Sequence, residues 1–286
     1  MPGQLITVAH SPDSDDAFMF YALAKNCIDS GGFEFRHVLK DIETLNRRAL
    51  EGRYEVTAIS FHAYAFLCDR YSLLDSGASM GDRYGPLVVS KRPMKPGELK
   101  GKVLAIPGAM TSAFLIMKLF QPDFTPVVVP FDRIFEAVAD DRADAGLIIH
   151  EGQLTYSSLG LHAVIDLGEW WHRETGLPLP LGGNAIRKDL GATAIRRIAR
   201  ILKQSIQYGL DHRAQALDYA MSFARDMDPR LADRFVGMYV NQRTLGYGAA
   251  ERRAVQLLLD RGHREGIIDR RVEVEFADRV GSDNQD

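Results

Sequence analysis

The chain has 286 residues, 46% of them hydrophobic and 26% charged, with a formal net charge of -3. This composition is typical of an ordinary globular protein, and the length is sufficient for two cores. The small negative charge gives no electrostatic basis for binding nucleic acid or an anionic membrane. No apolar run approaches the roughly 18 residues of a membrane span, and the N-terminus lacks the pattern of a secretory signal. We therefore expect a soluble, cytoplasmic protein without membrane insertion.

In the first part of the chain, strand and helix patterns alternate. The expected strands are Leu5–Ala9, Phe33–Val38, Val56–Ser60 and Pro86–Ser90. The expected helices are Phe18–Cys27, a helix capped by Asp41 that ends before Gly52, and Phe61–Cys68. Cys27 and Cys68 form no CxxC pair, so we expect two buried free thiols and no cysteine-rich metal site.

The alternation restarts after Lys91–Gly97, a polar and proline-rich connector. The strands expected beyond it are Lys102–Ile106, Val127–Val129 and Asp144–Ile149, and the helices are Ser112–Phe120 and Ile134–Asp140. Strands that alternate with helices predict parallel sheets with right-handed crossovers.

From Thr193 onward the pattern becomes helical. One apolar stripe with helical spacing consists of Ile195, Ile198, Leu202, Ile206 and Leu210. Leu217–Phe223 and Ala254–Leu259 indicate further helices. The polar tail, residues 281–286, is expected to be frayed.

Two α/β units followed by a helical third can be assembled in two ways. The chain either forms two domains in series, or crosses to a second lobe near residue 91 and returns near residue 183. We favour the second arrangement, because Pro178–Arg187 has the prolines, glycines and short apolar run of a return crossover. It predicts a large lobe of residues 1–90 with 188–286, a small lobe of residues 91–187, and a ligand cleft between them.

His150 directly follows the apolar run Ala145–Ile149. In open α/β sheets, ligands bind beyond the carboxyl ends of the strands, so this histidine stands where a catalytic group is expected. Its ordinary pKa near ~6.5 suits proton transfer at neutral pH. The alternative is a histidine that caps the strand and bonds a backbone carbonyl.

Three turns would face such a cleft. The turn Ser11–Ala17 carries Ser11, Asp13, Asp15 and Asp16, which are more polar groups than helix capping needs. A metal site is disfavoured, because the sequence shows no complementary His/Asp spacing. The roles of Asp13 and Asp15 stay open.

The second turn places Thr111 and Ser112 at a helix start, where hydroxyls and free N–H groups bind a carboxylate or phosphate. In the third, Ser60 ends a strand, and His62 near it is more typical of a surface or packing histidine. The chain contains neither a G-x-S-x-G nucleophile motif nor a G-x-G-x-x-G dinucleotide fingerprint. The residues alone therefore predict a two-lobed cleft with hydroxyls for an anion and one well-placed histidine.

Five segments together resemble a known family, the 1,4-dihydroxy-6-naphthoate synthases of the futalosine route to menaquinone. The resemblance runs from Ser11 to about Leu190. Its segments are Asp41–Asn46, Tyr84–Val89, Ala145–Glu151, Asp166–Trp171 and Glu174–Gly182. The segment Ala145–Glu151 favours this family over chorismate dehydratase, which is similar in fold.

The resemblance implies an α/β, two-lobed, type 2 periplasmic-binding-protein-like fold with a ligand cleft between the lobes and a helical C-terminal third. It implies a carbon–carbon lyase that needs no cofactor and converts cyclic de-hypoxanthine futalosine, a small carboxylate, to 1,4-dihydroxy-6-naphthoate and dihydroxyacetone. His150 is then the general base. Ser60, Thr111 and Ser112 match the family's polar pocket positions.

The first turn departs from the family. There the family usually reads Ser-Pro-Cys-Pro-Asn-Asp-Thr, and this chain keeps Ser11, Pro12 and Asp16 but adds negative charge at Asp13 and Asp15. Two alternatives therefore stay open. One is a diverged relative that acts on a neighbouring small carboxylate; the other is a non-catalytic solute-binding protein of the same fold.

Overall fold

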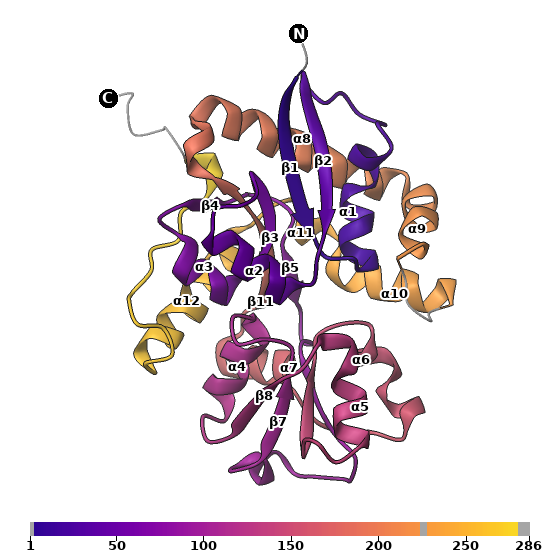
Figure 1. Cartoon of the computed structure of the whole chain (residues 1–286), viewed down its shortest axis with the longest axis vertical. Helices are drawn as coiled ribbons and strands as arrows, with labels where there is room; N and C mark the ends of the chain where they lie inside the picture. The colour runs from indigo at the N-terminus through magenta and orange to yellow at the C-terminus, as the bar shows by residue number, and fades with distance from the viewer. Residues whose placement is uncertain (1–2, 224–227, 280–286) are drawn as a thin grey trace.

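The computed structural model describes residues 3–223 and 228–279, and within these ranges it contains two β-sheets, one above the other in Figure 1. The first sheet has six strands in the order β2-β1-β3-β11-β4, with β5 also paired to β11. Their bounds are β1 Gln4–His10, β2 Phe33–Leu39, β3 Val56–Ser60, β4 Tyr71–Leu73, β5 Ser79–Gly81 and β11 Leu179–Arg187.

The second sheet has five strands in the order β10-β6-β9-β7-β8. Their bounds are β6 Leu87–Ser90, β7 Val103–Ile106, β8 Thr125–Val128, β9 Ala145–Ile148 and β10 His162–Asp166. Both sheets carry buried apolar strands such as β3 and β9, in which every residue is buried. For β9, the apolar run Ala145–Ile149 had indicated a buried strand.

The prediction of parallel sheets was wrong in part, because both sheets are mixed. Strand β1 is parallel to β2 and β3, but β11 is antiparallel to β3. Strand β7 is parallel to β8 and β9, but β6 is antiparallel to β9 and β10. Two strands joined by a βαβ crossover must be parallel. The chain enters β6 and β11 from the other sheet, without such a crossover, so the direction of these two strands is not constrained in this way.

Most predicted helices form within one to four residues of their expected bounds. The helices associated with the sheets are α1 Ser14–Ala24, α2 Ile42–Leu50, α3 Phe61–Leu67, α4 Ser112–Phe120, α5 Ile134–Ala139, α6 Gly152–Thr155 and α7 Leu167–Thr175. Asp41 caps α2 as predicted, since its side chain accepts a hydrogen bond from the backbone N–H of Thr44. Helix α1 begins four residues before the predicted Phe18, and the acidic Asp15 and Asp16 lie in its first turn, where negative charge is favourable.

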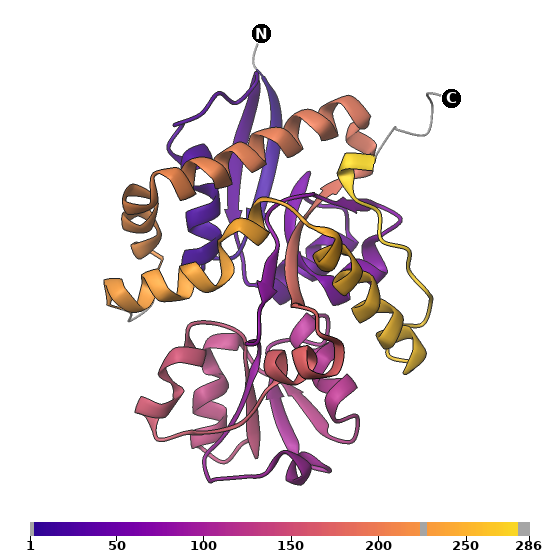
Figure 2. The same cartoon turned by 180° about the vertical axis from the view of Figure 1, so that it is seen from behind.

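The C-terminal third is helical, and much of it packs on the first sheet. Its helices are α8 Ala192–Asp211, α9 Arg213–Met221, α10 Pro229–Tyr239, α11 Gln242–Leu245 and α12 Ala249–Arg264. Figure 2 shows α8 lying across one face of this sheet. Ile195, Ile198 and Leu202 of the predicted stripe are buried in one cluster with Ile6 and Val8 of β1. The predicted tail, residues 281–286, lies outside the described residues.

The chain passes between the sheets in two places. Residues 82–86 lead from β5 to β6, and residues 176–178 lead from α7 to β11. Strand pairing thus puts β6 in the second sheet and β11 in the first. The lobe bounds themselves, residues 1–90 with 188–286 against 91–187, stay a prediction.

At Gly85, the first crossing between the sheets has no room for a side chain. A Cβ atom at Gly85 or at Gly168, the second residue of α7, would collide with main-chain atoms of the other segment. The N–H of Leu167 also donates to the carbonyl oxygen of Pro86 at 3.0 Å. The start of α7 therefore lies directly against the crossing segment.

Cys27 and Cys68 are free but only half-buried, which corrects the expectation of buried thiols. Cys27 lies just beyond the end of α1, and Cys68 directly follows α3. Among the described residues, no helix has the length and apolar composition that crossing a membrane requires.

Candidate functional site

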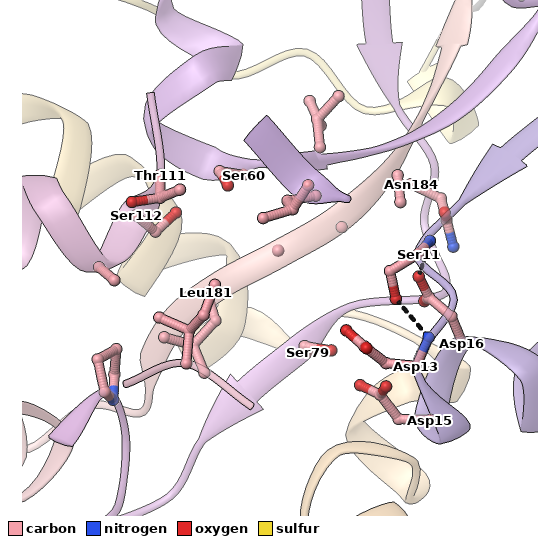
Figure 3. A pocket seen from close by; sticks show the side chains of 18 of the residues that line it. Ser11, Asp13, Asp15, Asp16, Ser60, Ser79, Thr111, Ser112, Leu181 and Asn184 are labelled. Atoms are coloured by element: carbon pink, nitrogen blue, oxygen red, sulfur yellow. Dashed lines mark hydrogen bonds between the residues drawn. The ribbon is translucent and has the colours of Figure 1, made fainter. Parts of the chain in front are cut away.

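A pocket with about 730 Å³ of empty space, part of it open to solvent, is lined by strand residues of the first sheet and by segments that follow strands of both sheets. Five of the six sequence-predicted site residues line it, namely Ser11, Asp16, Ser60, Thr111 and Ser112. Figure 3 shows Ser60, Thr111 and Ser112 at one end and Ser11, Asp13, Asp15 and Asp16 at the other.

Ser60, the last residue of β3, is held by Asn46 of α2. The Oδ1 atom of Asn46 accepts the backbone N–H of Ser60 at 2.9 Å, and its Nδ2 atom donates to Ser60 Oγ at 3.1 Å. Because Ser60 Oγ already accepts a protein hydrogen bond, its own hydrogen can be donated to a ligand. Asn46 is completely buried.

Thr111 and Ser112 use their hydroxyls differently. Thr111 Oγ1 donates to the carbonyl oxygen of Gly108 at 2.8 Å and accepts the N–H of Phe114 at 3.1 Å, so it caps α4. Ser112 Oγ accepts the N–H of His62 at 3.3 Å, which leaves its hydrogen for a ligand. The first N–H groups of α4 lack intrahelical acceptors, so this end of the pocket is rich in donors.

The opposite end is acidic. Asp16 Oδ2 accepts the N–H of Ser11 at 2.7 Å, and Ser11 Oγ accepts the N–H of Asp13 at 3.2 Å. Burial raises the pKa of Asp16 to about 6. Burial, together with the neighbouring charges of Asp16 and Asp13, raises the pKa of Asp15 well above its usual range. No Lys, Arg or His is among the described residues that line the pocket.

His150 does not line the pocket, although its neighbours Ile149 and Gln153 do. Its ring is buried against Phe131 and Phe135. Its Nδ1 atom accepts the N–H of Gly152 at 3.0 Å, and Nε2 lies 3.1 Å from the carbonyl oxygen of Phe131. This contact pattern requires a proton on Nε2 and none on Nδ1, so both nitrogens are engaged with the backbone.

Sequence reasoning missed four polar residues of the site, Asn46, Ser79, Gln153 and Asn184. Asn46 is buried on α2 beside the apolar Leu45 and Ala49 and the charged Glu43, and Asn184 interrupts the apolar run of β11. A polar residue on a buried face is the signal that identifies such positions. Gln153 lines the pocket from α6, and its Oε1 atom accepts a hydrogen bond from the hydroxyl of Tyr239 at 2.8 Å.

His62 is a packing histidine, one of the two roles that the sequence had indicated. It stacks on Phe114 and lies outside the pocket lining, and burial lowers its pKa to about 4. Within the described ranges, no group of three or more His, Cys, Asp or Glu side chains is arranged to hold a metal ion.

The chain is similar to proteins of menaquinone biosynthesis over most of its length. A family model described as "Menaquinone biosynthesis" matches residues 6–264. A curated 1,4-dihydroxy-6-naphthoate synthase of Thermus thermophilus is 41% identical over 264 residues, which cover 92% of this chain and 96% of the relative. A synthase of the same name from Streptomyces coelicolor is 35% identical over 274 residues, covering 94% and 96%.

Solved structures have the same fold. A protein of Archaeoglobus fulgidus is 48% identical, with a TM-score of 0.89 and coverage of 92% of this chain and 98% of that one. The alkanesulfonate-binding protein of Xanthomonas axonopodis pv. citri, bound to MOPS, is only 14% identical but reaches a TM-score of 0.73, covering 96% and 97%. The second likeness shows the fold alone. The predicted two-lobed, periplasmic-binding-protein-like fold with a helical C-terminal third is thus confirmed.

Proposed function

Because this chain belongs to the menaquinone biosynthesis family that includes the 1,4-dihydroxy-6-naphthoate synthases, we propose that it is the futalosine-pathway lyase that converts cyclic de-hypoxanthine futalosine to 1,4-dihydroxy-6-naphthoate and dihydroxyacetone. The observation that supports this most is the 41% identity over nearly the whole of both chains. We place the reaction in the cytoplasm as part of the same proposal.

The pocket supports a carboxylate substrate. Ser60 and Ser112 each accept a hydrogen bond from the protein, so their hydrogens are available to an anion, and the start of α4 adds N–H donors. In this proposal the carboxylate binds at that end of the pocket. Thr111 shapes the turn through its bonds to Gly108 and Phe114.

His150 is the general base of the proposed reaction. It follows β9, and the adjacent Ile149 lines the pocket. To accept a proton, its Nδ1 atom must give up the N–H of Gly152. The proposal therefore includes a rearrangement of the segment 150–153 when the substrate binds.

The direct test is to incubate the purified protein with cyclic de-hypoxanthine futalosine and to detect the naphthoate by mass. Formation of the naphthoate supports the proposal. Conversion of a neighbouring carboxylate instead would favour the diverged relative, an alternative motivated by the added acidic charge at Asp13 and Asp15. Tight binding without conversion would favour the solute-binding alternative, which the fold of the alkanesulfonate-binding protein motivates.

The role of His150 is tested by His150→Asn. A positioned base contributes roughly 10²–10⁴-fold to the rate, so turnover should fall by about that factor while substrate binding changes little. Because protonation disables a base, wild-type turnover should also fall as the pH is lowered through the pKa of the ring. His162→Asn, an exposed histidine of β10, is the matched control and should keep normal turnover. A folded His150→Asn protein with wild-type turnover would remove His150 from the mechanism.

A further inference from the structure

The two ends of the pocket differ in the hydrogen bonds that they can offer a ligand. One end presents the donors of Ser60, Ser112 and the start of α4. At the other end, Figure 3 shows Asn184 near Ser11 and Asp16, with Asp13, Asp15 and Ser79 close by. The side chains of this second group offer mainly acceptor oxygens.

Asn184 has an unsatisfied acceptor. Its side chain is 1% exposed, and its Nδ2 atom donates to the carbonyl oxygen of Gly77 at 3.3 Å. Its Oδ1 atom has no hydrogen-bond partner among the described residues. A buried acceptor without a donor lowers the stability of the folded protein. A native pocket therefore retains an unpaired acceptor where a ligand supplies the donor.

The negative charge at this end excludes an anionic ligand group as the partner of Asn184 Oδ1. Asp13, Asp15 and Asp16 line the pocket, and no cationic side chain is among the described residues that line it with them. Burial raises the pKa of Asp16, and burial together with the charges of Asp16 and Asp13 raises the pKa of Asp15, so each carboxyl can keep a proton at a higher pH than usual. A neutral group that both donates and accepts, such as an aliphatic hydroxyl, complements this set with Ser11 and Ser79.

We propose that Asp15, Asp16 and Asn184 form a polyol subsite that binds the aliphatic hydroxyls of the ligand's sugar-derived part. The carboxylate lies at the Ser60–Ser112 end, an orientation that rests on the proposed function. The residues of the first turn that depart from the family then select the hydroxyl-bearing end of the substrate.

Two probes separate the ends of the pocket. D-ribose carries aliphatic hydroxyls but no carboxylate, whereas 1,4-dihydroxy-6-naphthoate carries a carboxylate but no aliphatic hydroxyl. Saturation transfer by NMR should show wild-type binding of ribose, and Asp15→Ala and Asn184→Ala should weaken it about tenfold, the effect of one hydrogen bond to a charged or buried group. Calorimetry should show naphthoate binding unchanged in both variants and weakened in Ser112→Ala. Asp218→Ala, an exposed carboxylate of α9, is the control.

The KM for cyclic de-hypoxanthine futalosine should rise in Asp15→Ala by about the factor found with ribose. If the wild type forms no naphthoate, the proposed function fails, and the ribose measurement decides on the subsite alone. Absence of ribose binding by the wild type, or equal loss of ribose and naphthoate binding in Asp15→Ala, would overturn the subsite. A cation probe gives a further test of the subsite. If methylammonium raises the melting temperature of the wild type and Asp15→Ala abolishes this rise, the site binds a cation and the polyol subsite is overturned. If Asn184→Ala does not fold, Asp15→Ala decides.

Discussion

Thr111 and Ser112 are neighbours in the sequence, yet their hydroxyls serve different purposes. The Thr111 hydroxyl is committed on both sides, to the carbonyl oxygen of Gly108 and to the N–H of Phe114. The Ser112 hydroxyl only accepts, from the N–H of His62. The first residue therefore stabilises α4 and the second is available to a ligand, although the sequence pattern treats them alike.

Replacing Thr111 and Ser112 one at a time should separate the effect on helix capping from the effect on ligand binding. Thr111→Ala removes a helix cap and should lower the free energy of unfolding by about 1 kcal/mol. Ser112→Ala should weaken naphthoate binding about tenfold, measured by calorimetry, whereas Thr111→Ala should leave that binding nearly unchanged. The stability of Ser112→Ala should also fall, because the buried N–H of His62 loses its acceptor. Thr111→Ser, which keeps the cap, is the matched control. Equal loss of naphthoate binding in Thr111→Ala and Ser112→Ala would contradict this division.

Asp16 should make stability depend on pH in the acidic range. Its pKa in the folded protein, about 6, is above its ordinary value of 3.8, so folding favours the protonated form. This contribution is fully present below about pH 4 and is lost as the pH rises through about 6, with a slope of up to about 1.4 kcal/mol per pH unit. Asp16→Asn lacks this pH-dependent contribution. The difference in melting temperature, variant minus wild type, should therefore increase as the pH is raised from 4 to 6. A difference independent of pH would show that the pKa of Asp16 is the same in the folded and unfolded states.

At the scale of elements, α10 is linked to the segment that carries His150. The hydroxyl of Tyr239 donates to Gln153 Oε1 at 2.8 Å, and the N–H of Gln153 donates to the carbonyl oxygen of His150 at 2.9 Å. Tyr84, in the first crossing between the sheets, contacts the ring of Tyr239 and donates to the carbonyl oxygen of Met238. A helix of the C-terminal third thereby positions the short helix α6 of the other sheet.

Tyr239→Phe removes this hydrogen bond and keeps the ring. Because Gln153 is then released, we expect kcat to fall several-fold with a smaller change in KM, and stability to fall by only about 1 kcal/mol. Tyr219→Phe on α9 is the matched control, since its ring packs against Tyr21 and Phe223. A loss of stability with unchanged kcat would show that Tyr239 acts through packing alone.

At the scale of the whole molecule, the sequence predicted the elements better than their arrangement. Long periodic segments such as α8 were found because their apolar stripe is visible over several turns. Strands β4 and β5 were missed because each has only three residues, too few to show alternation. The direction of β6 and β11 depends on how the chain passes between the sheets, which no local pattern encodes.

The same limit applies to the site. Ser11, Ser60 and Ser112 were predicted because strand ends and helix starts converge in α/β sheets. Asn46 and Asn184 were missed because each acts through residues distant in sequence, Ser60 and Gly77. The orientation of His150 depends on the packing of Phe131 and Phe135 against its ring, which its position after β9 does not specify.

The glycine contact at the first crossing limits how far one stretch of the pocket wall can move. Pro86, which lines the pocket, directly follows Gly85, and Gly85 lies against the main chain of Gly168. Side-chain walls adapt to a ligand by changing rotamer, but two main-chain segments in contact cannot yield in that way. This stretch of the wall is therefore rigid, and a bulkier ligand would have to be accommodated at the faces formed by β11 and α6.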